Sequence, residues 1–235
     1  MNDDSINNSK FTNGVKLLSK ISFTKTILFN FYYFNLSTAF KFPVLIARNI
    51  VIRSLKGKVE IKNGVSFSMI RIGFGDIAIF DASKHKGIWR VEGTVTFNGS
   101  ALLGHGTRIS IEKNGNIIFG RNNIVTAEST IVSTNSVSFG DNCLVSWKVM
   151  ILDDDFHFVD EYKGDIKNEL PRSKPISIGN DVWIGCNSTI LKGSIIPDNS
   201  IIGAQSLING RFQEPNCVIA GNPAKIVKQN IKWRH

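Results

Sequence analysis

Residues 178–212 read IGNDVWIGCNSTILKGSIIPDNSIIGAQSLINGRF, with isoleucine at every sixth position, namely 178, 184, 190, 196, 202 and 208. In an α-helix, which turns by about 100° per residue, a six-residue step would scatter these side chains over three faces. In a β-strand the same step keeps them on one side, but ordinary strands run only about 3–10 residues. The chain must therefore turn between isoleucines. The pattern predicts a solenoid of short strands with the isoleucines stacked inside.

The residues between the isoleucines are those that tight turns require. Gly179-Asn180-Asp181, Gly185-Cys186-Asn187 and Pro197-Asp198-Asn199 supply unrestricted φ, fixed φ or side-chain hydrogen bonds to the backbone. The fourth residue after an isoleucine is usually small, as at Ser188 and Ser194, which suits a crowded interior. If each coil has three flat faces, three six-residue repeats give a coil of about 18 residues.

The same six-residue spacing of apolar residues continues upstream, with two-residue slips. It predicts four regular coils and looser ones over about 59–118; the regular coils are 119–136, 139–156, 178–195 and 196–213. The polar stretch 157–177 interrupts the spacing and is expected to protrude as a loop. Loops of this length in compact domains are usually functional.

Composition and charge limit the possible classes of protein. The three cysteines among the 235 residues are far apart, which gives neither a disulfide framework nor metal-ligand spacing and favours a reducing cytoplasm. The N-terminus does not resemble a signal peptide, and the uncharged run 26–40 is too short for a transmembrane helix, which needs about 20 residues. We expect two parts: an N-terminal extension, 1–58, and a repeat domain with a C-terminal tail, 59–235.

The N-terminal extension is basic and aromatic. Residues 1–60 hold nine lysines or arginines and three acids, and therefore six of the nine net positive charges of the chain. Two interpretations are open for residues 15–50. The segment caps the open end of the solenoid, or it rests on the inner face of the cytoplasmic membrane, where aromatic rings favour the interface and lysines favour anionic lipids.

Three motifs resemble those of the hexapeptide-repeat acyltransferases. They are PISIGNDVWIG at 175–185, VIAGNPAKIVK at 218–228 and MILDDDFH at 150–157. The resemblance covers about 60–228 and is greatest to the O-acetyltransferases of surface-polysaccharide clusters. It implies an all-β fold, a left-handed parallel β-helix. It also implies a homotrimer whose active sites lie between subunits, with acetyl-CoA as co-substrate and no metal.

The family's reaction needs a general base, and His157 is the candidate. Among the four histidines, only His157 stands where the repeat stops and the loop begins. In the family such a histidine deprotonates the acceptor hydroxyl, which then attacks the thioester. Asp153, Asp154 and Asp155 precede it. We expect Asp155 or Asp153 to orient the imidazole and to stabilise its protonated form.

The resemblance also implies residues that bind the two substrates. Those expected to bind acetyl-CoA are Trp183, Ala204, Ser206, Arg211, Asn222, Pro223 and Lys225. Trp183 is predicted to lie outward beside the groove, and Lys225 to meet a phosphate of CoA. Arg211 follows Asn209-Gly210, where the sugar acetyltransferases usually carry Thr-Lys. On the acceptor side, Glu128 replaces an asparagine of the galactoside enzymes, and Trp147 is a candidate for stacking on a sugar.

Other functions remain open. The nearest alternatives are N-acetylation of an amino-sugar nucleotide, drug acetylation, and a solenoid scaffold without catalysis. A γ-carbonic anhydrase would need three zinc histidines from neighbouring coils, which four scattered histidines do not suggest. The basic charge does not indicate nucleic acid, because no binding module is recognisable. We therefore predict an O-acetyltransferase acting on a saccharide for cell-surface polysaccharide.

Overall fold

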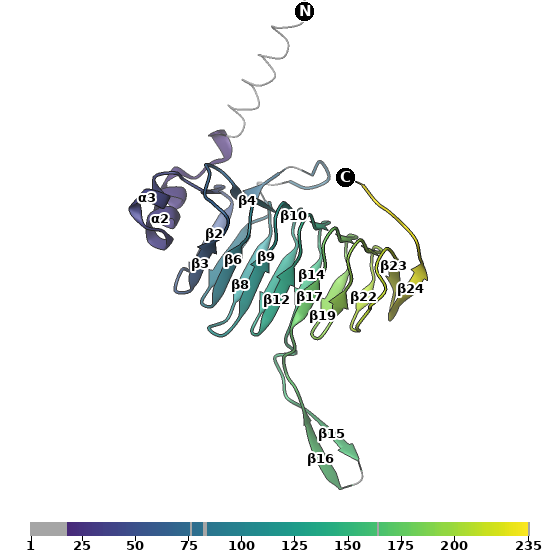
Figure 1. Ribbon diagram of the computed structural model, residues 1–235. Coiled ribbons are helices and arrows are strands. Elements are labelled where there is room, and N and C mark those ends of the chain that lie inside the picture. Colours follow the sequence, from purple (N-terminus) through teal and green to yellow (C-terminus); the bar gives the residue numbers. More distant parts are fainter. Residues whose placement is uncertain (1–17, 76, 82–83, 164, 235) are drawn as a thin grey trace, which may run out of the picture.

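The computed structural model describes residues 18–75, 77–81, 84–163 and 165–234. Its main feature is a three-sided parallel β-helix in which every strand pairs with the strand one coil further on (Figure 1). In the last coils Trp183 lies opposite Ile201 and Thr189 opposite Leu207, so that one coil takes 18 residues. The predicted solenoid with three hexads per coil is therefore confirmed.

The three faces of the β-helix are three sheets. Face 1 has nine strands: β1 (Val44–Ile46), β4 (Ile70–Phe74), β7 (Ala101–Gly104), β10 (Asn123–Val125), β13 (Leu144–Val145), β18 (Trp183–Ile184), β21 (Ile201–Ile202), β23 (Val218–Gly221) and the antiparallel β24 (Ala224–Lys228). Face 2 has seven: β2 (Ile50–Ser54), β5 (Gly87–Val91), β8 (Arg108–Ile111), β11 (Thr130–Ser133), β14 (Met150–Leu152), β19 (Thr189–Leu191) and β22 (Leu207–Ile208). Face 3 has six: β3 (Lys58–Ile61), β6 (Thr94–Phe97), β9 (Asn116–Phe119), β12 (Ser136–Phe139), β17 (Ile176–Ile178) and β20 (Ile195–Ile196).

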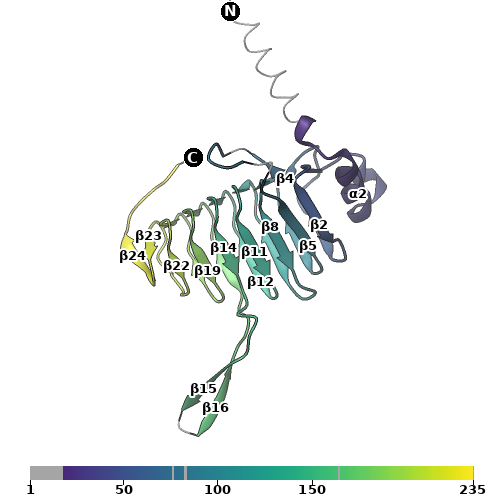
Figure 2. The same cartoon turned by 180° about the vertical axis from the view of Figure 1, so that it is seen from behind.

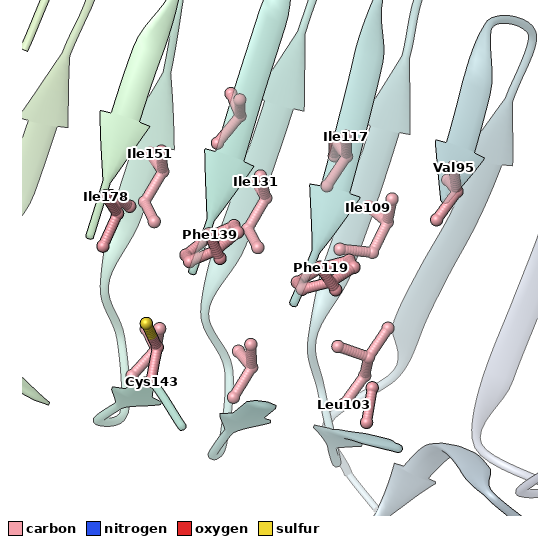
Figure 3. Packing of buried hydrophobic residues seen from close by; sticks show 14 of the residues in the cluster. Val95, Leu103, Ile109, Ile117, Phe119, Ile131, Phe139, Cys143, Ile151 and Ile178 are labelled. Carbon is pink, nitrogen blue, oxygen red and sulfur yellow. The ribbon is translucent and has the colours of Figure 1, made fainter. Parts of the chain in front are cut away.

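The interior is filled by the apolar residue at the centre of each hexad. The six isoleucines that recur at every sixth position from 178 to 208 are all at least 98% buried. Further upstream Phe97 stacks on Phe119, with ring centroids 5.3 Å apart. Phe119 stacks in turn on Phe139, at 5.1 Å (Figure 3). Burying one such side chain contributes about 1.5–3 kcal/mol, so the column of repeats supplies most of the driving force for folding.

The small residues at the corners are buried as well. Ser188, Ser194, Ser200 and Ser206 are at most 2% exposed. The hydroxyls of the first three donate to backbone carbonyls, as from Ser188 Oγ to the oxygen of Gly203 at 2.9 Å, whereas Ser206 Oγ accepts from the N–H of Gly221. A larger or fully apolar side chain would leave these turn carbonyls unsatisfied.

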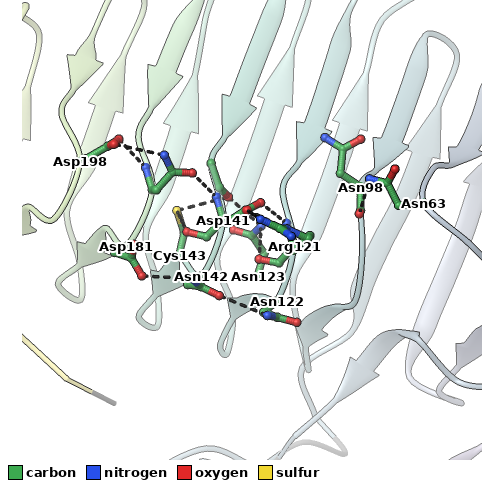
Figure 4. Close-up of polar contacts among 12 residues, drawn as sticks. Asn63, Asn98, Arg121, Asn122, Asn123, Asp141, Asn142, Cys143, Asp181 and Asp198 are labelled. Carbon is green, nitrogen blue, oxygen red and sulfur yellow. Dashed lines mark hydrogen bonds and ion pairs between the residues drawn. The ribbon is translucent and has the colours of Figure 1, made fainter.

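The corner between faces 3 and 1 is stabilised by a polar ladder. The Asp141 carboxylate accepts from the backbone N–H of Arg121 at 2.7 Å and from its guanidinium at 2.6 Å. The Asn180 side chain accepts from the backbone N–H of Asp141, and Asp198 accepts from that of Asn180 (Figure 4). Each side chain thus satisfies a backbone donor of the preceding coil.

We expect the Asp141→Ala variant to melt about 1–3 °C lower than the unaltered protein. The Arg121 guanidinium and backbone N–H hold the pKa of Asp141 below its usual value. A lowered pKa in the folded state stabilises at neutral pH, and this contribution is lost as the pH falls through that pKa. The melting temperatures of the variant and the unaltered protein should therefore differ more at pH 7 than at pH 3. Asp165→Ala, at an exposed turn, is the control; an equal effect from it would contradict the ladder's role.

The β-helix starts earlier than the predicted boundary between residues 58 and 59. Strands β1, β2 and β3 form a complete first coil, and β1 pairs in parallel with β4 from Val44 onward. The sequence predicts too late a start because the basic, aromatic composition of this coil makes its six-residue spacing hard to recognise. Residues 1–17 of the expected extension lie outside the described residues.

Two helices cap the open end of this first coil, α2 (Phe23–Tyr33) and α3 (Leu36–Ala39) (Figure 2). Phe29 is fully buried against Trp89. Asn30 exchanges two hydrogen bonds with the backbone of Val44, at 2.7 and 3.2 Å, and Thr26 Oγ1 accepts from the N–H of Ile46. Side chains of α2 thus replace a missing strand and protect the sheet edge. The capping interpretation is confirmed for this part of the segment 15–50.

Candidate active site

The predicted excursion leaves the β-helix at the corner between faces 2 and 3. It contains an antiparallel hairpin of β15 (Val159–Lys163) and β16 (Ile166–Leu170), which projects from the solenoid (Figure 1). The two legs are joined at the base, where the N–H of Asp155 donates to the oxygen of Arg172 at 3.1 Å and the N–H of Lys174 to that of Asp153 at 3.0 Å. His157 is therefore exposed at the root of a fixed excursion.

Asp153 lies beneath this root and is fully buried. Its carboxylate accepts from Ser133 Oγ at 2.7 Å and from the backbone N–H groups of Thr134 and Asn135 at 2.8 and 3.0 Å. All of these donors belong to the preceding coil. Asp153 therefore anchors the corner and does not contact the imidazole, contrary to its predicted orienting role.

Asp154 is also fully buried, although no sequence pattern distinguishes it from the other two aspartates. It accepts from Thr134 Oγ1 and from the N–H of Phe156, and it pairs with Arg172 on the returning leg at 3.0 Å. This pair closes the base of the hairpin. Only a tertiary contact identifies Arg172, because it belongs to none of the sequence motifs.

Asp155 contacts His157 through its main chain. Imidazole Nδ1 lies 3.1 Å from the carbonyl oxygen of Asp155, whereas the Asp155 carboxylate pairs with Lys192. If Nδ1–H donates to this carbonyl, Nε2 is the unprotonated nitrogen that can accept a proton. The predicted orientation by a carboxylate is thus replaced, in the single chain, by orientation from a backbone carbonyl.

A polar pocket of about 320 Å³ adjoins this corner. It is lined by Glu112, Lys113, Asn114, Thr134, Phe156 and Arg172. One aromatic ring surrounded by charged and amide groups is the composition that sugars require, since their faces are apolar and their rims are hydroxyl-rich. The sequence motifs did not point to this pocket, because Glu112–Asn114 belongs to a turn two coils earlier.

Two of the residues predicted to bind acetyl-CoA, Ala204 and Ser206, lie at a different corner, between faces 1 and 2. Ala204 is exposed there, after β21. Ser206 is buried, and both of its polar groups are hydrogen-bonded within the chain. Its N–H donates to Ser188 Oγ at 3.3 Å, and its Oγ accepts from the N–H of Gly221 at 3.1 Å. Ser206 is therefore used within the fold, which does not support its predicted role as a donor to CoA.

Trp183 lies outward on β18, as predicted, with 37% of its surface exposed. Its Nε1 donates to Ser146 Oγ at 3.0 Å, and its ring lies 6.0 Å from that of Trp233 in the C-terminal tail. Trp233 in turn donates to the oxygen of Asp181 at 2.6 Å. The tail thus returns along the solenoid and covers part of Trp183, a contact that no spacing in the sequence indicates.

The other predicted CoA residues surround the C-terminal end. Asn222 and Pro223 form the turn between β23 and β24, and their peptide bond is cis. Lys225 is exposed on β24, and Arg211 is exposed after β22. Both cations are accessible to solvent and could therefore bind the phosphate groups at the nucleotide end of CoA.

Glu128 and Trp147 lie near the CoA residues, at the corner between faces 1 and 2. The Glu128 side chain is only 8% exposed and pairs with His85, on the segment between β4 and β5. Trp147 is half-buried one coil further on. His85 was not predicted to have a role, because its partner is 43 positions away in the sequence. The single chain thus offers Glu128 to an acceptor only while its carboxylate contacts His85.

Face 2 separates the two groups of residues. His157 and the polar pocket lie where face 2 ends, whereas Glu128, Trp147 and Ala204 lie where it begins. One chain does not bring the candidate base together with most of the predicted binding residues. A catalytic centre that uses both corners needs a second copy of the chain.

A family model described as "bacterial transferase hexapeptide (six repeats)" matches residues 175–210. The putative lipopolysaccharide biosynthesis O-acetyl transferase WbbJ of Escherichia coli K12 is 34% identical over 159 residues, 62% of this chain and 76% of that protein. An uncharacterised 24.8 kDa protein of the cps region of Klebsiella pneumoniae is 30% identical over 143 residues, 61% of this chain and 62% of its own length. The chain therefore spans less than two thirds of the Klebsiella relative.

Among solved structures, the polySia-specific acetyltransferase NeuO aligns with a TM-score of 0.59 over 82% of this chain and 79% of that one. Its sequence identity is 23%, so this likeness concerns the fold. The likeness in fold thus extends well beyond the 175–210 repeats.

Proposed function

Because the chain belongs to the hexapeptide-repeat acyltransferases, we propose that it transfers an acetyl group from acetyl-CoA to a hydroxyl of a saccharide used in cell-surface polysaccharide biosynthesis. The observation that carries this proposal is His157, exposed at the corner with its Nδ1 held by a backbone carbonyl. WbbJ, named as a putative O-acetyl transferase of lipopolysaccharide biosynthesis, supports the choice of reaction and substrate class.

The chain's part in the reaction is proton transfer and positioning. Nε2 of His157 takes the proton of the acceptor hydroxyl while its oxygen attacks the carbonyl carbon of the acetyl thioester. The carbon–sulfur bond then breaks, and the imidazolium returns its proton to the departing thiolate of CoA. The Asp155 carbonyl favours this cycle, because it accepts from Nδ1–H in both protonation states of the ring.

We propose that the saccharide occupies the polar pocket beside His157. Phe156 offers an aromatic face to the sugar ring, and Glu112 and Arg172 offer an acceptor and a donor to its hydroxyls. Glu128 and Trp147 complete the acceptor site from an adjacent copy. Trp183, Ala204, Arg211 and Lys225, with the Asn222-Pro223 turn, bind acetyl-CoA.

The expected assembly is a homotrimer with three active sites between subunits. A cyclic trimer can place the His157 corner of one copy against the Trp147 corner of the next, which a single chain keeps apart. Sedimentation velocity at micromolar concentration should give the mass of three chains of 26.1 kDa. A monomer that nevertheless transfers acetyl groups at full rate would contradict the inter-subunit site.

The direct test is acetyl-CoA turnover with a panel of acceptors. Thiol release in the presence of surface-polysaccharide precursors, with an O-acetyl ester in the product by mass spectrometry, is the expected result. An amide product on an amino-sugar nucleotide would favour N-acetylation, and turnover only with antibiotics would favour drug acetylation. A chain that neither binds nor consumes acetyl-CoA would be a scaffold.

We further propose that the enzyme is cytoplasmic and contacts the inner face of the membrane peripherally through residues 15–50. In the described part of the chain, no helix is long and apolar enough to cross a membrane. The proposed contact is therefore with the membrane surface, where lipid-linked precursors of surface glycans are accessible.

A further inference from the structure

The outer surface of the helical cap is apolar. Helix α2 buries Phe29 against the β-helix, yet five of its other large apolar side chains are exposed, namely Phe23, Ile27, Leu28, Phe31 and Tyr32. Leu36 and Phe40 extend this surface and are 66% and 67% exposed. The rings of Phe31 and Phe40 touch, with centroids 5.1 Å apart. A continuous apolar surface of this kind marks an interaction site.

A cationic pocket of about 410 Å³ lies at the margin of this apolar surface. Lys25, Arg48 and Lys86 line it together with Leu28, which itself belongs to the exposed apolar set. Lys25 Nζ is fixed by hydrogen bonds to the carbonyl oxygens of Arg48 and Ile50, at 2.8 and 2.6 Å. Among the described residues lining the pocket there is no carboxylate.

The charges in this pocket repel one another. Burial, and then the nearby charge of Lys86, lower the pKa of Lys25. A bound anion would relieve both the repulsion and the cost of burying a cation. The surrounding sequence adds no negative charge, since the 55 residues between Asp4 and Glu60 contain no aspartate or glutamate. The cap is thus complementary to a surface that is apolar inside and anionic outside.

We propose that the cap is a docking surface for an anionic lipid bilayer. The apolar side chains of α2 and α3 enter the interface between headgroups and acyl chains, and the pocket of Lys25, Arg48 and Lys86 receives a lipid phosphate. Both elements belong to an anionic membrane, whereas a protein partner would explain the apolar side chains without the cationic pocket. The inference specifies the membrane contact of the proposed function and rests on that part of it alone.

A cyclic trimer would strengthen this contact. Rotation about one axis turns three copies of the cap toward the same end of the assembly. Three weak contacts on one bilayer then act together, so that modest affinity per chain is sufficient for stable attachment. The β-helices, with their His157 corners, would extend from the membrane toward its aqueous side.

Flotation of the full chain with vesicles tests the proposal. We expect it to float with phosphatidylcholine vesicles that contain about one third phosphatidylglycerol, to remain unbound with phosphatidylcholine alone, and to dissociate at high salt, as electrostatic binding does. Arg48→Gln with Lys86→Gln should weaken binding about 30-fold, the equivalent of roughly 1 kcal/mol per cation. Leu28→Ser with Phe31→Ser should weaken it about tenfold or more.

Matched variants elsewhere control for surface charge and hydrophobicity. Tyr162→Ser with Ile166→Ser removes two exposed apolar side chains from the hairpin, and Lys228→Gln with Lys232→Gln removes two exposed cations from the C-terminal end. Both should float like the unaltered protein. Thermal melts establish that each cap variant is folded.

Three results would overturn the proposal: no flotation with anionic vesicles, equal flotation of folded cap variants, or a trimer that dissociates when Leu28 and Phe31 are replaced. The last would identify the apolar surface as a contact between copies. Acetyl transfer to a soluble saccharide separates this inference from the reaction. If only the docking fails, turnover remains without flotation; if only the reaction fails, flotation remains without turnover.

Discussion

Replacing His157 by alanine should lower acetyl transfer by about 10²–10⁴-fold, the usual contribution of a positioned general acid–base group. The side chain is exposed and makes one hydrogen bond, to the carbonyl of Asp155. Its removal should therefore leave the melting temperature nearly unchanged. Affinity for acetyl-CoA should persist as well, because the residues proposed to bind it lie mainly at another corner and at the C-terminal end. Steady-state kinetics and calorimetric titration with acetyl-CoA measure the two effects separately.

Phe158→Ala is the matched control for disturbance of the hairpin root, since Phe158 adjoins His157 and is 70% exposed. It should retain most of the turnover. A folded His157→Ala variant that binds acetyl-CoA and acetylates the true acceptor at near the original rate would exclude this mechanism and reopen the scaffold interpretation.

Replacing Asp153 by alanine should destabilise the protein by about 3 kcal/mol or more, because it removes three charge-assisted hydrogen bonds and leaves buried backbone donors unpaired. The melting temperature should fall by roughly 6–12 °C. Turnover should fall with it, since the carboxylate anchors the corner from which His157 projects. Thermal melts and kinetics at a temperature where the variant is folded give both quantities.

Asp155→Ala is the comparison that separates anchoring from orientation. The Asp155 carboxylate is 38% exposed and pairs with Lys192, a kind of ion pair that contributes at most about 1 kcal/mol. The contact to the imidazole comes from the backbone, which the substitution keeps. We therefore expect nearly normal stability and turnover within a few-fold. If folded Asp155→Ala instead lost more turnover than Asp153→Ala, the carboxylate of Asp155 would be the orienting group in the assembled site.

The hexad spacing determined the central fold because a six-residue repeat with turn formers between isoleucines fits one geometry. The coil of 18 residues, the burial of Ser188 and Ser194, and the protruding excursion all follow from local rules. The first coil cannot be predicted from those local rules. Its six-residue spacing is hard to recognise in the sequence, and the free edge of its strand β1 is completed by Asn30 and Thr26 of α2.

The sequence by itself determined the solenoid, its excursion and the position of His157 at the root of that excursion, since each depends on residues close together in the chain. Only the tertiary structure decided what surrounds that histidine. Stacking of coils brings Ser133 and Thr134 onto Asp153, Arg172 onto Asp154 and Lys192 onto Asp155. The tertiary fold also brings His85 into contact with Glu128, and Trp233 into contact with Trp183. These pairs join residues 18 to 50 positions apart, where side-chain type alone does not specify a partner, and the geometry of the coil does.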